Sequence, residues 1–471
     1  MFNYTTMFLL YFRPCFSRQA TFNWFVVAFV GLMLREDTLG VTSIVRALML
    51  PPHHYVHLLN HFHSTALELK NLLRYWWLWV AKSNLAYTHN GCPILVGDHT
   101  KIPKDGRKIP SVATLHQESE TSSKPSFFRG HNWGCISMLT GTSKKLFSTP
   151  LWAQIHQPVN LKGVDEEYEP MTTRMVSMAF EVVKTLETNI ILVLDAFFSA
   201  APVFEKANVG CSPFTITVLT RAKKNVVAYL DPIRSKRKKR GRKAVFGRKI
   251  KLFQKFTHWN KKFLTATATI YGKEETIQYY HMPLLWRKFK GNKILFVWAE
   301  TSRGKMIVMS SDLDIDPVAA IELYCYRVKI ETVFSVLKNV FGACNYHFWS
   351  LYLLPQSRKP RKKDKKEKRI SLDPAKTIQT LNAIETFFNI QAIVVGFLQI
   401  CCMKFTKEVS DKANTWLRTF NPKAPSEFIA KKAIEKVFFK HFCLFTKNPI
   451  MDLIRDKQKG GEIEGNLRMV G

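Results

Sequence analysis

Two aspartates stand where buried strands are expected to end. Asp98 closes the apolar run 93–98, and Asp195 closes the run 189–195. The second run is continuously apolar, as in a strand that is buried on both faces of a sheet. In open α/β sheets, functional sites lie at the carboxyl ends of the strands. A strand-end aspartate is also a common turn residue, so these two positions indicate chemistry only if further groups join them.

A third carboxylate lies on a helix that we expect over residues 317–341. Asp316 and Pro317 are typical N-cap and first-turn residues. At the helical period, four polar side chains share one stripe of about 60° of arc. They are Tyr324, Arg327, Glu331 and Lys338. In an arbitrary helix, the same stripe could be a solvated face on which Arg327 and Glu331 form a weak i,i+4 pair.

The spacing Y-x2-R-x3-E-x6-K in these four residues resembles the signature of the insertion-sequence DDE transposases of the YREK branch, the insertion sequence 4-like superfamily. Segments 98–108, 115–119 and 130–133 resemble the first-aspartate region of that branch. Segments 194–198 and 219–223 resemble its second-aspartate region and the strand that follows. The resemblance covers about residues 91–345.

This resemblance implies an α/β fold, namely a ribonuclease H-like mixed sheet with helices and a β-rich insertion. The 136 residues between Asp195 and Glu331 leave room for that insertion at about 225–300. The expected layout has helical N- and C-terminal regions. It comprises a helical DNA-end-binding domain (1–90), a catalytic domain (91–345), a basic linker (346–375) and a helical region suited to dimerisation (376–471).

The resemblance also implies that Asp98, Asp195 and Glu331 are both catalytic residues and metal ligands. Hard carboxylate oxygens suit two Mg²⁺ ions, for which Mn²⁺ could substitute. Two such ions activate a nucleophile and neutralise the leaving oxygen of a phosphodiester. Asp98 would bridge both ions, and each of the other two acids would bind one of them.

Seven further residues are expected to contact DNA. Arg327 and Lys338 would bind phosphates, the first in bidentate fashion and the second as a point charge. Tyr324 would donate a hydrogen bond near the cut. Lys101, Lys104 and His131 are candidates close to the first aspartate, with surface charge or packing as the alternative. Family members stack a flipped base on a Trp of the insertion, for which Trp298 is the first candidate and Trp286 the second.

Composition supports a polyanionic partner. The chain has 70 Lys and Arg against 36 Asp and Glu, a net charge of +34. Charge of this size favours nucleic acid first and an anionic membrane surface second. Two basic runs, 234–243 and 358–369, are expected to be solvated arms on phosphates or plain linkers. A hydrophobic content of 46% excludes a chain that is disordered throughout.

Other signals bear on compartment and on rival metal sites. The nine cysteines form no CxxC pair, which indicates a reducing compartment. The apolar stretches 22–34 and 390–403 are too short or too interrupted to span a bilayer, so we expect a cytoplasmic protein without a membrane partner, associated with the bacterial nucleoid when active. His57 and His61 share a helical turn but lack further ligands. The alternating Asp312, Asp314 and Asp316 lack the glycine and distal glutamate of a calcium loop.

The predicted function is therefore that of a DNA transposase of a mobile element. It would bind terminal inverted repeats, hydrolyse each end and join the 3′-hydroxyl to target DNA, without a small-molecule substrate. Its partners would be the element ends, the target and a second copy of itself, because synapsis joins two ends. Two alternatives remain open: a transposase-derived DNA-binding protein without catalysis, and a ribonuclease H-like nuclease or resolvase that cuts without joining.

Overall fold

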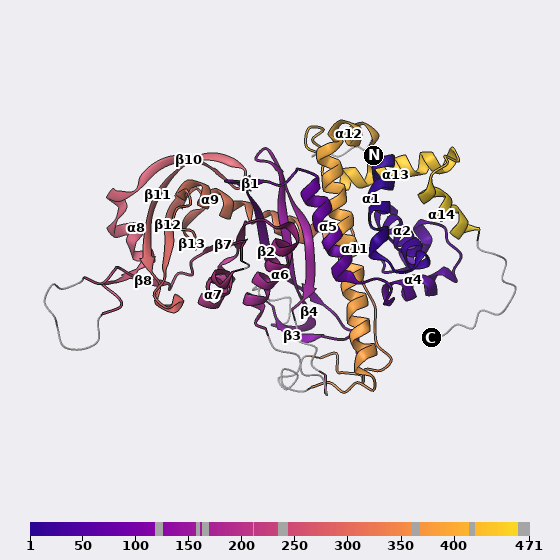
Figure 1. Cartoon of the computed structure of the whole chain (residues 1–471), viewed down its shortest axis with the longest axis horizontal. Helices are drawn as coiled ribbons and strands as arrows, with labels where there is room; N and C mark the ends of the chain where they lie inside the picture. Colours follow the sequence, from indigo (N-terminus) through magenta and orange to yellow (C-terminus); the bar gives the residue numbers. More distant parts are fainter. Residues whose placement is uncertain are drawn as a thin grey trace.

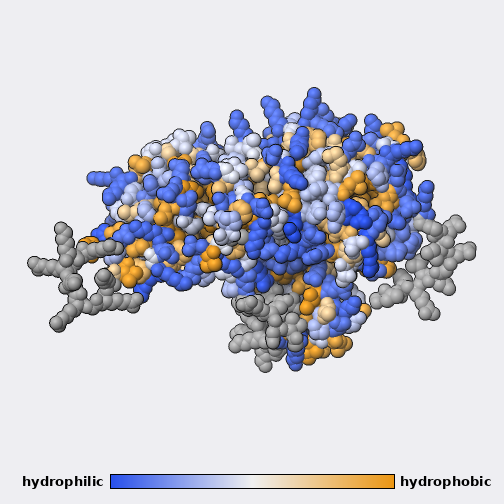
Figure 2. Space-filling view, viewed as in Figure 1, coloured by the Kyte–Doolittle hydropathy of each residue, from blue (hydrophilic) through white to orange (hydrophobic). Residues whose placement is uncertain are grey.

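The computed structural model describes most of the chain. The described ranges are 1–117, 126–156, 161–162, 169–210, 212–233, 244–359, 368–413 and 420–459. The basic run 234–243 and residues 360–367 of the second basic run lie outside these ranges. Hydrophilic side chains cover much of the face shown in Figure 2, in keeping with the large excess of charge.

A mixed sheet forms the centre of the molecule (Figure 1). Its core strands are β2 (Cys92–Pro103), β4 (Phe127–Thr142), β5 (Lys145–Ile155), β6 (Ile190–Leu194) and β7 (Ile216–Arg221). They lie in the order β5-β4-β2-β6-β7. Strands β2, β6 and β7 are parallel, whereas β4 runs antiparallel to both of its neighbours. The predicted mixed α/β fold is confirmed, and this sheet is consistent with the ribonuclease H-like class.

The region between Asp195 and Glu331 extends this sheet beyond β7. Its strands are β8 (Val227–Tyr229), β9 (Lys249–Lys251), β10 (Leu264–Ile270), β11 (Lys273–Leu285), β12 (Lys293–Thr301) and β13 (Gly304–Ser310). Strand β13 pairs antiparallel with β7, and β12, β11 and β10 follow in turn. This part forms the left-hand end of Figure 1, together with the short helix α8 (Lys255–His258). Two short strands, β1 (Thr88–His89) and β3 (Ala113–His116), pair with β2 and β4.

Four helices pack close to the sheet. They are α6 (Met171–Leu186), α7 (Ala201–Val209), α9 (Pro317–Tyr326) and α10 (Lys329–Asn339). The single helix that we expected over 317–341 is therefore wrong. Near Arg327 and Val328 the hydrogen bonds span three residues instead of four, from the amide of Arg327 to the carbonyl of Tyr324 and from Glu331 to Val328. This tighter turn ends α9 and begins α10.

Helices from both ends of the chain pack together beside the central sheet, and α10 contacts α11 (Pro374–Lys404) there (Figure 1). The N-terminal set is α1 (Phe2–Tyr11), α2 (Gln19–Leu34), α3 (Thr42–Ala47), α4 (His54–Phe62) and α5 (Leu69–Lys82). The C-terminal set is α11 (Pro374–Lys404), α12 (Thr406–Ala413), α13 (Glu427–Cys443) and α14 (Pro449–Gln458). The division into domains remains a prediction, although the two predicted terminal regions share one core in this structure.

Helix α11 is the axis of that core. It is long and apolar enough to cross a membrane, but 94% of its apolar window is buried inside the protein, as in the core helix of a globular domain. It lies between strand β5 and helices α2, α4 and α5. Its two interior glutamines have polar partners: Gln391 accepts a hydrogen bond from Arg35 at 2.7 Å, and Gln399 donates to Glu427 at 2.7 Å. These contacts explain how polar residues fit into so apolar a helix.

Candidate active site

Asp98 lies at the centre of the candidate site. It is on β2, after the buried residues 94–97, and its side chain is 13% exposed. One carboxylate oxygen accepts a hydrogen bond from the amide of His99 at 2.8 Å, and the other accepts one from Arg327 at 2.8 Å. Burial raises the pKa of Asp98 to about 6, the nearby Arg327 opposes that shift, and the negative charges of Asp195 and Glu331 add to it.

Strand register places Asp195 beside Asp98. Gly97 on β2 pairs with Leu194 on the parallel strand β6, so the next residue of each strand is an aspartate at the same edge of the sheet. The Asp195 carboxylate accepts a hydrogen bond from the amide of Phe197 at 2.7 Å. Its backbone carbonyl accepts one from the hydroxyl of Thr220 at 2.7 Å. The turn-residue alternative therefore applies to Asp195 in part, while the sheet still brings it to the edge where Asp98 lies.

Arg327 joins the first and third acids. Its guanidinium donates to Asp98 at 2.8 Å and to Glu331 at 2.6 Å. The Arg327 side chain is 15% exposed, whereas that of Glu331 is 54% exposed. The i,i+4 pair that a plain solvated face would show is present, but it continues to a nearly buried aspartate 229 residues away in sequence. The structure therefore brings the three predicted acids to one edge, with Arg327 between two of them.

Tyr324 lies against the same edge. It is buried, and this burial raises its pKa to about 12. Its hydroxyl interacts electrostatically with Arg327, Arg221 and Asp195. A tyrosine in this position stays protonated at neutral pH and can donate a hydrogen bond.

Three residues near the acids were not singled out from the sequence. Arg221 ends β7, next to the strand that carries Asp195. Tyr271 lies in the turn between β10 and β11, with φ of 50°, and the Arg303 guanidinium lies 4.5 Å from the centre of its ring. Burial raises the pKa of Tyr271, and the positive charges of Arg327, Arg221 and Arg303 oppose that shift. Arg221 falls in the segment 219–223 that carries the resemblance, whereas only tertiary contacts reveal Tyr271 and Arg303.

Lys338 and Lys101 lie on the same two elements as the acids. The ammonium of Lys338, on α10, donates a hydrogen bond to the hydroxyl of Thr100 on β2. Lys101 donates to the carbonyl of His116 at 3.0 Å. Both line a cavity of about 960 Å³, so both predicted DNA contacts are placed on an accessible surface near the acids.

Two of the other predicted DNA contacts have their polar atoms bonded inside the protein, as the packing alternative expects. Lys104 is 8% exposed and donates to the carbonyls of Tyr346, at 3.0 Å, and Cys344. His131 is fully buried, and its ring nitrogens bond the Tyr346 hydroxyl at 2.6 Å and the Pro110 carbonyl at 2.8 Å. Both residues position the loop after α10 against β2 and β4.

The predicted base-stacking tryptophans are also core residues. Trp298 has no exposed surface, and its indole N–H donates to the carbonyl of Leu252 at 2.9 Å. Trp286 is 3% exposed and makes an edge contact with Phe204. Neither ring is accessible to a base in this arrangement, which favours the plain core role for both. Alternation on a strand does not tell a buried from an exposed ring when a helix or loop covers the second face.

The rival cation sites have structural roles. His61 is buried, and His57 instead pairs with His54 through their Nδ1 atoms at 3.0 Å. Asp316 caps α9 by accepting from the amide of Ala319 at 2.7 Å. Asp312 accepts from the amide of Asp314 at 2.9 Å, as in a turn.

The acid edge partly fits a divalent cation. Its donor chemistry fits, because carboxylate oxygens are the ligands that hard divalent cations prefer, and the charges of Asp195 and Glu331 are close enough to Asp98 to raise its pKa. In the described part of the chain, however, no three His, Cys, Asp or Glu side chains are arranged to hold a metal ion. Arg327 supplies the positive charge between Asp98 and Glu331 in this arrangement.

A sequence family described as "DDE superfamily endonuclease" matches residues 11–283, more than half of the chain. The chain belongs to this family. The matched range includes Asp98 and Asp195 but ends before Glu331. Membership of the YREK branch remains a prediction.

Comparisons with curated proteins and with solved structures add little to this family assignment. No curated protein matches the sequence. Among solved structures, the chain is similar to a piggyBac transposase described in a synaptic complex with hairpin DNA. The identity is 12% and the TM-score 0.34, with 96% of this chain and 78% of that chain covered. A likeness of this size carries no conclusion about fold or function.

Proposed function

We propose that this DDE superfamily endonuclease is a DNA transposase. It binds the terminal inverted repeats of its element, cleaves the strand at each end and transfers the 3′-hydroxyl to target DNA. The observation that carries the proposal is the contact of Arg327 with both Asp98 and Glu331. This contact joins the family's first aspartate to the residue whose spacing suggested the third acid. A dimer follows from the need to hold two DNA ends.

The three acids are proposed to hold two divalent cations, Mg²⁺ or Mn²⁺, which would activate the attacking oxygen and neutralise the leaving one. Asp98 and Asp195 lie on rigid neighbouring strands, so their carboxylates are already positioned. Glu331 is more exposed and bonded to Arg327. Glu331 would help to hold a cation, and Arg327 would bind a DNA phosphate in bidentate fashion.

Buried Tyr324 and the nearby Arg221 extend the positive side of the site. The pKa of Tyr324 lies at about 12 because of burial, so its hydroxyl keeps its proton and can donate to a phosphate oxygen. The positive charge of Arg221 is close enough to this hydroxyl to lower its pKa in part. Together with Arg327, these groups would stabilise the negative charge that develops on the phosphate in the transition state.

The test uses the full chain and DNA that flanks its reading frame. Matching inverted repeats on both sides would define the ends, and labelled duplexes carrying them would be incubated with Mg²⁺ and a supercoiled plasmid. The proposal predicts strand-specific cleavage at the repeat boundary, followed by joining to the plasmid. Cleavage without joined product would indicate a nuclease or resolvase. Specific binding without cleavage in either Mg²⁺ or Mn²⁺ would indicate a DNA-binding protein that lacks catalysis.

A further inference from the structure

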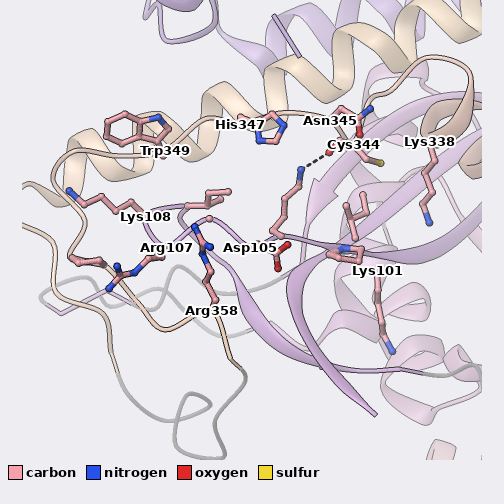
Figure 3. A pocket seen from close by; sticks show the side chains of 16 residues that line it. Lys101, Asp105, Arg107, Lys108, Lys338, Cys344, Asn345, His347, Trp349 and Arg358 are labelled. Atoms are coloured by element: carbon pink, nitrogen blue, oxygen red, sulfur yellow. Dashed lines mark hydrogen bonds between the residues drawn. The ribbon is translucent and has the colours of Figure 1, made fainter. Parts of the chain in front are cut away.

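A basic cavity lies next to the acid edge (Figure 3). Its volume is about 960 Å³. Six basic side chains line it: Lys101, Lys104, Arg107, Lys108, Lys338 and Arg358. Asp105 is the one carboxylate among its lining residues. Figure 3 shows Lys101 and Lys338 at one end, and Arg107, Lys108 and Arg358 at the other, beside Trp349.

Two elements connect this cavity to the acids. Strand β2 carries Asp98 and then, three residues later, Lys101. Helix α10 carries Glu331 and then, two turns later, Lys338, a separation of about 10 Å along the axis. A DNA strand with its scissile phosphate at the acids would therefore enter the cavity at the Lys101–Lys338 end. The far end, with Arg107, would hold nucleotides further from the cut.

Most of the basic side chains of the cavity have no carboxylate partner among the residues that the structure describes. Within the described ranges, five of its basic residues form no ion pair with a carboxylate: Lys104, Arg107, Lys108, Lys338 and Arg358. Lys104 is nearly buried and bonded to carbonyl oxygens, so the accessible positive charge of the cavity is mainly that of Arg107, Lys108 and Arg358. A bound polyanion would supply negative charge for these three side chains.

An exposed tryptophan adds a second kind of contact. Trp349 lines the cavity and is 50% exposed. Other tryptophans that the structure describes are core residues, for example Trp76, Trp77 and Trp133, which have at most 1% exposed surface. A large ring beside unpaired cations is the combination that binds single-stranded nucleic acid, because the ring stacks on a base while the cations bind the backbone.

We propose that this cavity binds a short single-stranded segment of DNA, with a base stacked on Trp349 and phosphates on Arg107, Lys108 and Arg358. A duplex fits the observations less well. Stacking on Trp349 requires an unpaired base, and the cavity is the size of a ligand pocket rather than a surface that follows the duplex grooves. The proposal rests on the proposed function only for the direction in which the strand leaves the acids.

The test measures binding to fluorescein-labelled oligothymidylate of about eight nucleotides, within the site size of single-strand binding proteins. Fluorescence anisotropy is recorded with the full chain in EDTA, where no cleavage occurs. A blunt duplex of equal length and an oligouridylate serve as competitors. The variants are Trp349→Ala, Trp349→Phe and the double variant Arg107→Gln/Lys108→Gln. The matched controls are Phe439→Ala, which removes a 69% exposed ring on α13, and Lys440→Gln/Lys447→Gln, which removes two exposed charges far from the cavity.

We expect Trp349→Ala to weaken oligothymidylate binding by about 10-fold, Trp349→Phe to restore most of it, and the Arg107 and Lys108 double variant to weaken it at least as much. Both control variants should bind like the unmodified chain. Equal binding by Trp349→Ala and the unmodified protein would overturn the proposal. So would an equal loss of duplex binding, which indicates a general DNA surface, or preferential binding of the oligouridylate, which indicates an RNA site.

This readout is independent of catalysis. Asp98→Asn should keep the oligothymidylate affinity in EDTA, since the substituted carboxylate lies outside the cavity. A protein that binds the oligonucleotide through Trp349 but never cleaves DNA would contradict the proposed function and leave the cavity assignment intact. A protein that cleaves DNA but binds the oligonucleotide equally well with Trp349→Ala would support the proposed function and contradict the cavity assignment.

Discussion

The acid edge and the basic cavity share strand β2 and helix α10, yet they handle charge in opposite ways. At the acid edge, Arg327 pairs with both Asp98 and Glu331. In the cavity, Arg107, Lys108 and Arg358 form no ion pair within the described ranges. The negative groups are thus compensated by a neighbour, and the positive groups are left to solvent. A surface that binds polyanions needs positive side chains without an internal partner. A cluster of acids that folds without metal needs a neighbouring positive charge.

The two regions therefore differ in how they would bind a charged partner from outside the chain. The acid edge is stable as it stands and has to give up an internal ion pair before it can bind a cation. Arg107, Lys108 and Arg358 of the cavity have no ion pair to give up within the described ranges and would gain a counter-charge directly. Substitutions at the acid edge should therefore affect chemistry, and substitutions in the cavity should affect DNA affinity.

The largest effect is expected for Asp98→Asn. The substitution keeps the shape of the side chain and removes the charge that would bridge two cations, so cleavage of labelled DNA in Mg²⁺ should fall by about 10⁴-fold. End binding in EDTA should change less than about threefold, because phosphate contacts lie elsewhere. Asp314→Asn is the control, since Asp314 is an exposed turn residue with no contact to the acids. A cleavage rate that survives Asp98→Asn would remove this residue from the mechanism.

The charge swap Arg327→Glu with Glu331→Arg should be nearly as severe. The swapped residues could still pair along the helix, but the new carboxylate at position 327 would then face Asp98, which now accepts a hydrogen bond from Arg327. We expect a loss of cleavage of about 10³-fold or more and a free energy of unfolding lower by about 1–3 kcal/mol. Chemical denaturation and 3′-end cleavage measure the two effects. An active swap would show that the pair is only a solvated face.

The sequence predicted the acid edge well because its geometry depends on local features. The apolar run before Asp195 specifies a buried strand, and such a strand in a parallel pair brings its end to the site edge. The spacing of Arg327 and Glu331 specifies a contact on one helical turn. The turn at Val328 escaped prediction, since hydrogen bonds that shift from four to three residues leave no strong pattern in sequence. Tyr271 and Arg303 also escaped it, because only tertiary contacts bring them to this edge.

The sequence predicted the DNA contacts poorly because they depend on what covers each side chain. Lys104 and Trp298 have residue types typical of DNA contacts, but the loop after α10 covers the first and the insertion covers the second. Trp349 was not singled out, since its neighbours give no periodic pattern that marks it as exposed. Burial of a single long side chain is a tertiary property, which composition and spacing do not determine.

A moderate effect is expected from neutralising the basic run 236–243, whose structure lies outside the described residues. Each phosphate that Lys or Arg neutralises adds about 0.9 to the slope of log affinity against log salt for duplex DNA. Replacing the basic residues with Gln should therefore lower the magnitude of this slope by about 0.9 for each phosphate contact that is lost. Non-specific binding should weaken by about 10- to 100-fold at low salt. Filter binding or anisotropy over a salt series measures it. An unchanged slope would identify the run as a linker.

The smallest effect is expected for Lys338→Ala, which lies where the two regions meet. Lys338 shares α10 with Glu331 but lines the cavity, and its ammonium is bonded to Thr100 rather than to an acid. If the division between chemistry and affinity holds, the variant should weaken end binding by about 5- to 10-fold, as expected for one lost phosphate contact, while cleavage at saturating protein stays within about threefold of the unmodified rate. The Lys338 side chain is partly buried, and this burial lowers its pKa. A second variant, Lys338→Met, keeps the packing of the stem and removes only the charge. Equal affinities for the Ala and Met variants would assign the effect to the charge. A cleavage rate that falls as far as that of Asp98→Asn would instead place Lys338 in the reaction itself and erase the boundary between the acid edge and the cavity.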